Sequence, residues 1–205
     1  MQGRLTLTTF NKQRQETVKQ MSEDDTIDFF ESLGLHRFNN KCNENVISLH
    51  IYTPAHINSE CQNEVPIIYE LIKPLGDLCE IKKLQLSSSS PQIFTSFNAL
   101  ADILRVELAN ETFLDRPQST IERISKLLES MRFNPKEIKQ YAHWDSGHYT
   151  RNLIAYDEKF TLLLLCWDKK QYSPIHSHAE SSCWMKMVQG SLQEIRYVQE
   201  EDEKE

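Results

Sequence analysis

The sequence is short of the features that mark several large classes of protein. Its 205 residues include only 5 glycines and 7 prolines, which excludes a collagen-like chain and argues against disorder along most of the length. No apolar run approaches the roughly 18 residues of a membrane-spanning helix. The longest run, residues 160–167, has the length of a strand. The first residues lack a cationic stretch followed by an apolar one, so we expect no secretory leader.

Basic residues and paired cysteines are also scarce. Lys and Arg total 23 against 30 Asp and Glu, a formal net charge of −7, so nucleic-acid binding has no electrostatic support. We expect neither nucleic acid nor a membrane as a partner. The five cysteines are scattered and form no CxxC pair, which argues against a disulfide framework and against a cysteine-rich zinc site. We therefore expect reduced thiols and a cytoplasmic protein.

Hydrophobic patterning divides the chain into β-rich and helical zones. Residues 1–62 are rich in strand formers, with a hairpin turn expected at 39–45. Residues 63–95, punctuated by proline and serine, form a connector with one short apolar element at 67–72. The strands predicted in the chain cover residues 5–10, 26–30, 46–52, 150–155, 160–167, 173–178, 183–188 and 192–199.

Residues 96–141 carry the helical signals. Apolar residues from Phe97 to Leu108 recur at the spacing of one helix face, which indicates a helix packed on the core. Ser119 and Glu122 form a capping box before a second apolar stripe. Asn134 followed by Pro135 is typical of the cap and first residue of a third helix.

The sharpest local feature is the pair His176 and His178. Residues two apart on a strand point to one face, so the two imidazoles would converge, an arrangement that suits a first-row transition metal. Four residues, Cys183, six residues and Gly190 follow the pair. This spacing resembles the first motif of the cupin superfamily, except that the first motif glycine falls at Lys170 and Cys183 takes the position of the usual glutamate ligand.

A longer block narrows the resemblance. Residues 149–153, 160–167 and 173–190 together closely resemble the cysteine dioxygenase family, in which cysteine replaces the cupin glutamate and three histidines hold iron. The resemblance implies that His176 and His178 are two ligands of an Fe(II) ion. No histidine follows His178 to supply the third.

The third histidine stands at the front of the chain. Residues 32–40, with His36, and residues 47–54, with His50 and Tyr52, resemble the second half of the family pattern, which here precedes the first half. The segment Met1 to Leu5 also echoes residues 188–192. The order fits a circular permutant, or a piece of a tandem array or misjoined chain.

The resemblance implies one domain in three parts. We expect a mainly β fold, a small jelly-roll-like cupin barrel with a few packed helices, apparently circularly permuted. Residues 1–62 would be the C-terminal half of the barrel, residues 63–95 the connector, and residues 96–205 the helices with the N-terminal half. A monomer is expected, with a half-swapped dimer as the alternative.

The family's site residues carry over to further positions in the chain. Arg151 matches the arginine that binds the substrate carboxylate, with a surface ion pair as its alternative role, and Tyr149 matches a tyrosine near the site or a packing residue. Cys183 and Tyr52 match the pair that forms a thioether bond in some members; Cys183 is otherwise a plain buried thiol. Alternation along one strand also allows a Ser48–His50–Tyr52 hydrogen-bond relay. We expect Thr53–Pro54 to be cis, as in the family.

The implied activity is iron-dependent oxidation of L-cysteine by O2 to cysteine sulfinic acid, a step of cysteine catabolism that leads toward taurine biosynthesis. The alternatives are a catalytically inactive or misassembled cupin, and a dioxygenase for another small thiol. The separation between His36 and the pair His176 and His178 within one chain distinguishes an assembled enzyme from a misassembled one.

Overall fold

The computed structural model describes residues 13–29, 34–55, 67–68, 95–109, 116–178 and 181–199. Within these ranges no helix combines the length and the apolar character needed to cross a membrane. The strands are β1 (Gln13–Met21), β2 (Thr26–Phe29), β3 (Leu35–Asn39), β4 (Val46–Thr53), β5 (Ile67–Ile68), β6 (Thr150–Tyr156), β7 (Thr161–Trp167), β8 (Ser182–Gln189) and β9 (Leu192–Gln199). The helices are α1 (Phe97–Leu108), α2 (Gln118–Ser130) and α3 (Pro135–Tyr141).

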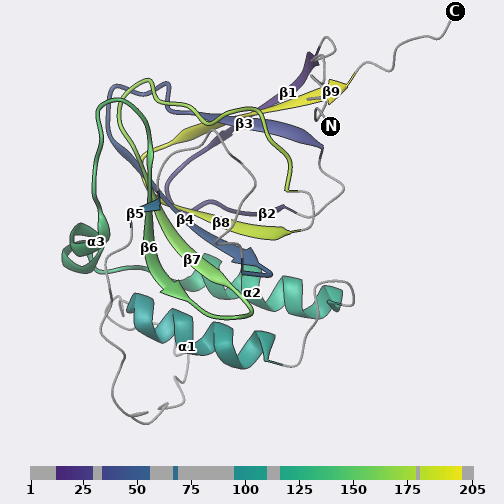
Figure 1. The fold of residues 1–205 in the computed structure, drawn as a ribbon, viewed down its shortest axis with the longest axis vertical. Helices are drawn as coiled ribbons and strands as arrows, with labels where there is room; N and C mark the ends of the chain where they lie inside the picture. Colours follow the sequence, from purple (N-terminus) through teal and green to yellow (C-terminus); the bar gives the residue numbers. More distant parts are fainter. Residues whose placement is uncertain are drawn as a thin grey trace, which may run out of the picture.

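The strands form two sheets that face each other. One has the order β1-β9-β3 and the other the order β2-β8-β4-β7-β6-β5, and the described neighbours are antiparallel except β5 and β6. Figure 1 shows the smaller sheet above the larger one, with α1 and α2 below the larger sheet. The prediction of a mainly β, cupin-like fold with a few packed helices is confirmed.

Strands from the two ends of the chain are interleaved. In the larger sheet β8 lies between β2 and β4, and β4 lies between β8 and β7. In the smaller sheet β9 lies between β1 and β3, with Gln13 opposite Gln199. The barrel is therefore built from both halves of the chain.

Bent corners carry the chain from one sheet to the other. β8 continues into β9 through Gly190, whose φ of +76° is a conformation that only glycine adopts at no steric cost. A Cβ at Gly190 would also lie 3.0 Å from Val46 Cγ2. Beside this corner β1 turns into β2, and the backbone N–H of Asp24 donates to the Met187 carbonyl (3.0 Å).

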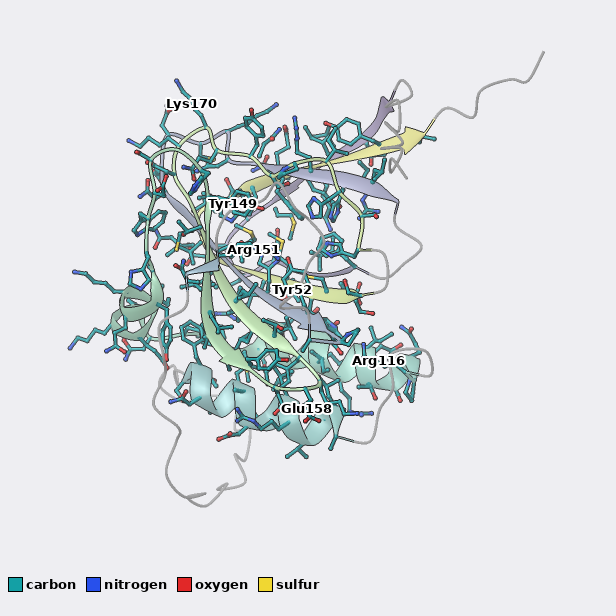
Figure 2. The ribbon with its side chains drawn as sticks, viewed as in Figure 1. Tyr52, Arg116, Tyr149, Arg151, Glu158 and Lys170 are labelled. Carbon is teal, nitrogen blue, oxygen red and sulfur yellow. The ribbon has the colours of Figure 1, made fainter. Side chains whose placement is uncertain are left out.

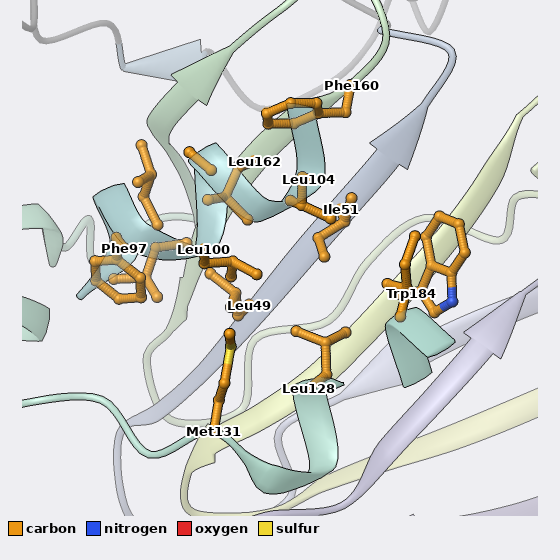
Figure 3. Close-up of a cluster of buried hydrophobic side chains, with 14 of the residues drawn as sticks. Leu49, Ile51, Phe97, Leu100, Leu104, Leu128, Met131, Phe160, Leu162 and Trp184 are labelled. Carbon is orange, nitrogen blue, oxygen red and sulfur yellow. The ribbon is translucent and has the colours of Figure 1, made fainter. Parts of the chain in front are cut away.

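Strand alternation separates two hydrophobic cores. On β4, Leu49 and Ile51 pack against the helices with Leu104 of α1 and Trp184 of β8 (Figure 3). The opposite face of β4 carries Ser48, His50 and Tyr52. The second core lies between the sheets and contains Phe29, Phe38, Leu163, Leu165, Trp167, Met185, Met187 and Leu192. The polar residues of β4 therefore border a buried interior.

The observed start of α3 agrees with the prediction from the sequence, whereas that of α2 does not. The Asn134 side chain accepts a hydrogen bond from Lys136 N (2.9 Å), and Pro135 is the first residue of α3, as predicted. The capping box at Ser119 is wrong, because α2 begins at Gln118 and its N-cap, Pro117, makes no side-chain cap bond. Ser119 is already helical.

Two other expectations are wrong, and a third concerns residues outside the described ranges. Residues 173–178 form no strand, because Pro174 has no N–H to donate to a neighbouring strand. Hydrogen bonds between Ser173 and Phe38 and an isolated bridge between His176 and His36 join the segment to β3. Residues 39–45 form no hairpin turn, because β3 and β4 belong to different sheets. The predicted strand at 5–10 lies outside the described residues, whereas β1 was not predicted.

Candidate metal centre

Three histidines from distant parts of the chain meet at one point. The candidate ligand nitrogens of His36, His176 and His178 all lie within 4.8 Å of one another. His36 Nε2 is 3.1 Å from His178 Nε2. The backbones of His36 and His176 exchange two hydrogen bonds of 2.8 and 2.9 Å, which bring the start of β3 to the extended segment that holds the pair. The backbone bridge therefore sets the approach of the rings.

The three imidazoles are suited to a transition metal. Burial, with the neighbouring His36, lowers the pKa of His176 to about 4, and burial, with both other histidines, lowers the pKa of His178 to about 2. Neutral imidazole is the form that binds metal. Two nitrogens each about 2.1 Å from an ion and at right angles to each other lie about 3 Å apart, close to the observed separation. An all-nitrogen set favours iron, copper, nickel or zinc over calcium or magnesium.

Aromatic side chains flank His36 and His178 on one side. The Phe29 ring makes an edge contact with His36 (centroids 4.9 Å apart) and stacks on His178 (5.5 Å). The Phe38 ring lies 5.2 Å from His36. The site is therefore apolar on the side formed by β2 and β3, which strengthens electrostatic interactions within it.

His36 also contacts the ion pair between Glu194 and Arg196, which the sequence did not predict. Its Nδ1 lies 3.4 Å from Oε1 of Glu194, a fully buried residue of β9. Arg196 Nε donates to the same oxygen (2.9 Å). Burial raises the pKa of Glu194, but hydrogen bonds from His36 and Arg196 outweigh it and lower the pKa overall. The sequence offered one indication of this pair: the charged residues Glu194 and Arg196 alternate along a strand with the apolar Leu192 on the same face.

The predicted relay residues of β4 are joined by hydrogen bonds. Ser48 Oγ lies 2.9 Å from His50 Nε2, and His50 Nδ1 lies 3.4 Å from the Tyr52 hydroxyl. Trp167 Nε1, which can only donate, donates to Ser48 Oγ (2.9 Å). A neutral imidazole donates through one ring nitrogen and accepts through the other, so His50 can link Ser48 to Tyr52. Burial, followed by the charge of Arg151, holds the pKa of His50 well below its usual value.

Tyr52 connects this relay to the histidine cluster and to Cys183. Tyr52 and Cys183 are directly opposed residues of β4 and β8, and the Tyr52 ring centroid lies 5.7 Å from that of His178. Cys183 Sγ lies 3.7 Å from His50 Nδ1 and is not part of the three-histidine group. Burial raises the pKa of both the Cys183 thiol and the Tyr52 hydroxyl.

Arg151 and Tyr149 approach from β6 and the segment before it. The Arg151 guanidinium lies 5.4 Å from the centre of the Tyr52 ring. The Tyr149 ring stacks on Trp167 with centroids 4.2 Å apart. Figure 2 shows Tyr149, Arg151 and Tyr52 in the middle of the molecule, with Lys170 at its edge. The structure also has Thr53–Pro54 in the cis form, as predicted.

Comparison with known proteins agrees with this geometry. The family model described as cysteine dioxygenase type I matches residues 92–205, more than half of the 205-residue chain. The chain belongs to this family. The matched part contains Arg151, His176, His178 and Cys183, whereas His36 and the relay lie outside it. No solved structure matches the chain.

The curated relatives carry the same family name. The chain is 38% identical over 100 residues to cysteine dioxygenase type 1 of Bos taurus, which is 48% of each protein. It is 38% identical over 99 residues to the protein of that name from Rattus norvegicus, and 42% identical over 80 residues to the one from Danio rerio, where 38% of this chain and 39% of the relative are covered. The chain therefore spans about half the length of the Bos taurus and Rattus norvegicus relatives it matches.

Proposed function

We propose that the chain is an iron(II)-dependent thiol dioxygenase that oxidises L-cysteine to cysteine sulfinic acid with O2. The observation that carries the proposal is the convergence of His36 with His176 and His178 in one chain of this family. An iron(II) ion bound by these residues would supply open coordination sites and the redox chemistry that sulfur oxidation needs. The convergence within one chain argues against the alternative of a misassembled cupin.

The surrounding residues are suited to binding a small amino-acid thiol. A guanidinium binds a carboxylate through two parallel hydrogen bonds, so Arg151 would hold the substrate carboxylate beside Tyr52. The contact between the Tyr52 hydroxyl and His50 Nδ1 would orient that hydroxyl beside the bound thiol. The rings of Phe29 and Phe38 would restrict water around the reacting sulfur.

A thioether between Cys183 and Tyr52 is part of the proposal. Their opposed positions on β4 and β8 support it. The bond would join Sγ to the ring carbon beside the hydroxyl, and the two hydrogen atoms lost would pass to O2. Peptide mass spectrometry after aerobic turnover should then find a linked pair lighter by two hydrogen atoms, and Cys183→Ser should abolish it.

The proposal also includes an exchanged order of the two halves of the barrel. The pairing of β8 with β2 and β4 supports a closed single-chain barrel in which each half supplies ligands. Size-exclusion chromatography with light scattering distinguishes this monomer from a half-swapped dimer.

The central test is iron retention and turnover. Protein loaded with Fe(II) should consume O2 when L-cysteine is added and release cysteine sulfinic acid. His36→Ala should lose both bound iron and turnover, because the ligand set is then incomplete. His148→Ala is the matched control, since that side chain is 44% exposed and pairs with Asp145 on a loop. Turnover that survives in His36→Ala would overturn the assignment.

A substrate series separates cysteine from other thiols. Arg151→Gln should raise KM for L-cysteine, whose carboxylate it would bind, and should leave KM for cysteamine, which has no carboxylate, unchanged. Turnover of 3-mercaptopropionate in preference to L-cysteine would favour a mercapto-acid dioxygenase. Iron binding without turnover of any of the three thiols would favour an inactive cupin.

A further inference from the structure

His36 differs from His176 in the group that faces its outer ring nitrogen. His176 Nδ1 faces the carbonyl oxygen of Pro174 (3.0 Å), a neutral acceptor. His36 Nδ1 faces the carboxylate of Glu194 (3.4 Å). A histidine that binds a metal commonly donates its other N–H to such a group, and a carboxylate makes the imidazole a stronger ligand.

The register of the smaller sheet places this carboxylate. In the antiparallel pairing of β3 with β9, His36 is opposite Arg196 and Phe38 is opposite Glu194. Residues two apart on a strand share a face, so all four side chains lie on the same face of the sheet. Glu194 and His36 are therefore diagonal neighbours, and their exposed fractions of 0% and 2% leave no water to replace their contact.

Arg196 determines which partner donates. Its Nε donates to Oε1 of Glu194 (2.9 Å) and its Nη2 donates to Oε2 (3.3 Å), so both carboxylate oxygens are acceptors. Arginine has no acceptor atom and stays charged. The hydrogen in the contact between Glu194 and His36 must then belong to His36 Nδ1, and the Nε2 lone pair is directed at the other two histidines.

We propose that Glu194, held by Arg196, is a positioning residue that keeps the proton of His36 on Nδ1 and thereby presents Nε2 as a metal ligand. The tautomer is a property of the metal-free protein. The effect on metal affinity rests on the proposed function.

Two substitutions at Glu194 separate the effect of its hydrogen-bond acceptor from the effect of its negative charge. Glu194→Gln keeps an oxygen acceptor but removes the negative charge. Glu194→Met has similar length and offers no comparable acceptor, while Arg196, 30% exposed, can turn to solvent. Loss of the group that accepts from a ligand histidine commonly weakens metal binding about 10–100-fold. The loss of Fe(II) affinity should therefore be near the lower figure in Glu194→Gln and near the upper figure in Glu194→Met. Glu107→Gln is the matched control, because Glu107 also accepts from an arginine, Arg123, but on the helices.

The test has two independent measurements. Imidazole 15N NMR of the metal-free protein should find His36 protonated on Nδ1 in the wild type and in Glu194→Gln, and no longer held in that tautomer in Glu194→Met. Anaerobic Fe(II) titration should rank the affinities wild type, Gln, Met, with Glu107→Gln equal to wild type.

A proton on Nε2 of His36 in the wild type would overturn the proposal, and that measurement needs no variant to fold. Equal Fe(II) affinity in the wild type and a folded Glu194→Met would overturn it as well. If the wild type binds no Fe(II), the proposed function fails, while the tautomer measurement still supports or overturns the role of Glu194.

Discussion

The serine in the relay is the most informative place to perturb the structure. Ser48 Oγ accepts from Trp167 Nε1 and forms a hydrogen bond with His50 Nε2, both at 2.9 Å, and the three residues are at most 3% exposed. Ser48→Ala removes the hydroxyl that is the hydrogen-bond partner of both Trp167 and His50. A buried polar group left without a partner costs about 1–3 kcal/mol, so the variant should lose about 2–6 kcal/mol of unfolding free energy.

A double-mutant cycle isolates the part due to the indole N–H. Trp167→Phe alone should cost about 1–3 kcal/mol through the lost bond and the lost ring volume. When Trp167 is already Phe, Ser48→Ala no longer leaves an unpaired indole N–H. The double variant should therefore be about 1–3 kcal/mol more stable than the sum of the single losses predicts.

Equilibrium urea unfolding of the four metal-free proteins measures these free energies, provided the slopes of the transitions are alike. Agreement of the double variant with the simple sum to within about 0.5 kcal/mol would refute the reasoning, because it would mean that the serine and the indole are not coupled.

Three further predictions concern the packing and the corners. Leu104→Ala, at a fully buried position of α1, should lower the unfolding free energy by about 3–5 kcal/mol, whereas Val106→Ala on the same helix, 67% exposed, should change it by less than about 0.5 kcal/mol in thermal or urea unfolding. Burial raises the pKa of the Cys166 thiol to about 12, so the native state keeps a proton that the unfolded chain releases from about pH 9 upward. Stability should thus fall as pH rises through that window, by up to about 1.4 kcal/mol per pH unit from this thiol, and an equally steep decline in Cys166→Ala would contradict the assignment. Gly190→Ala should be more destabilising than Gly34→Ala. Both glycines have positive φ, but only a Cβ at Gly190 would lie 3.0 Å from a side chain. Equal losses in melting temperature would speak against crowding at the corner.

Much of the architecture was predictable because its signals are local. The apolar stripe of α1 and the cap and proline of α3 depend on residues three or four positions apart. The alternation of β4 likewise predicts that Ser48, His50 and Tyr52 share one face, and the hydrogen bonds that join the three side chains agree with it. Errors arose where a local signal competes with a neighbour, as at Pro117, which starts α2 ahead of the predicted cap.

The histidine pair illustrates a correct expectation reached through an incomplete reason. His176 and His178 converge as expected, but the segment that holds them is not a strand. Its extended backbone is maintained by the two hydrogen bonds that His176 exchanges with His36. The same bridge that shapes the pair therefore also brings in the third imidazole.

Periodicity along the chain dictates which side chains share a face, and the residues around His176 and Cys183 suffice to indicate the family. Periodicity cannot dictate which strands pair with each other, because strand pairing depends on packing between segments that are far apart in the sequence. That choice placed His36 of β3 beside His176, and it turned the face of β9 that carries Glu194 toward the buried interior. Only the tertiary structure thus decided that a carboxylate, invisible as a site residue in the sequence, contacts a candidate metal ligand.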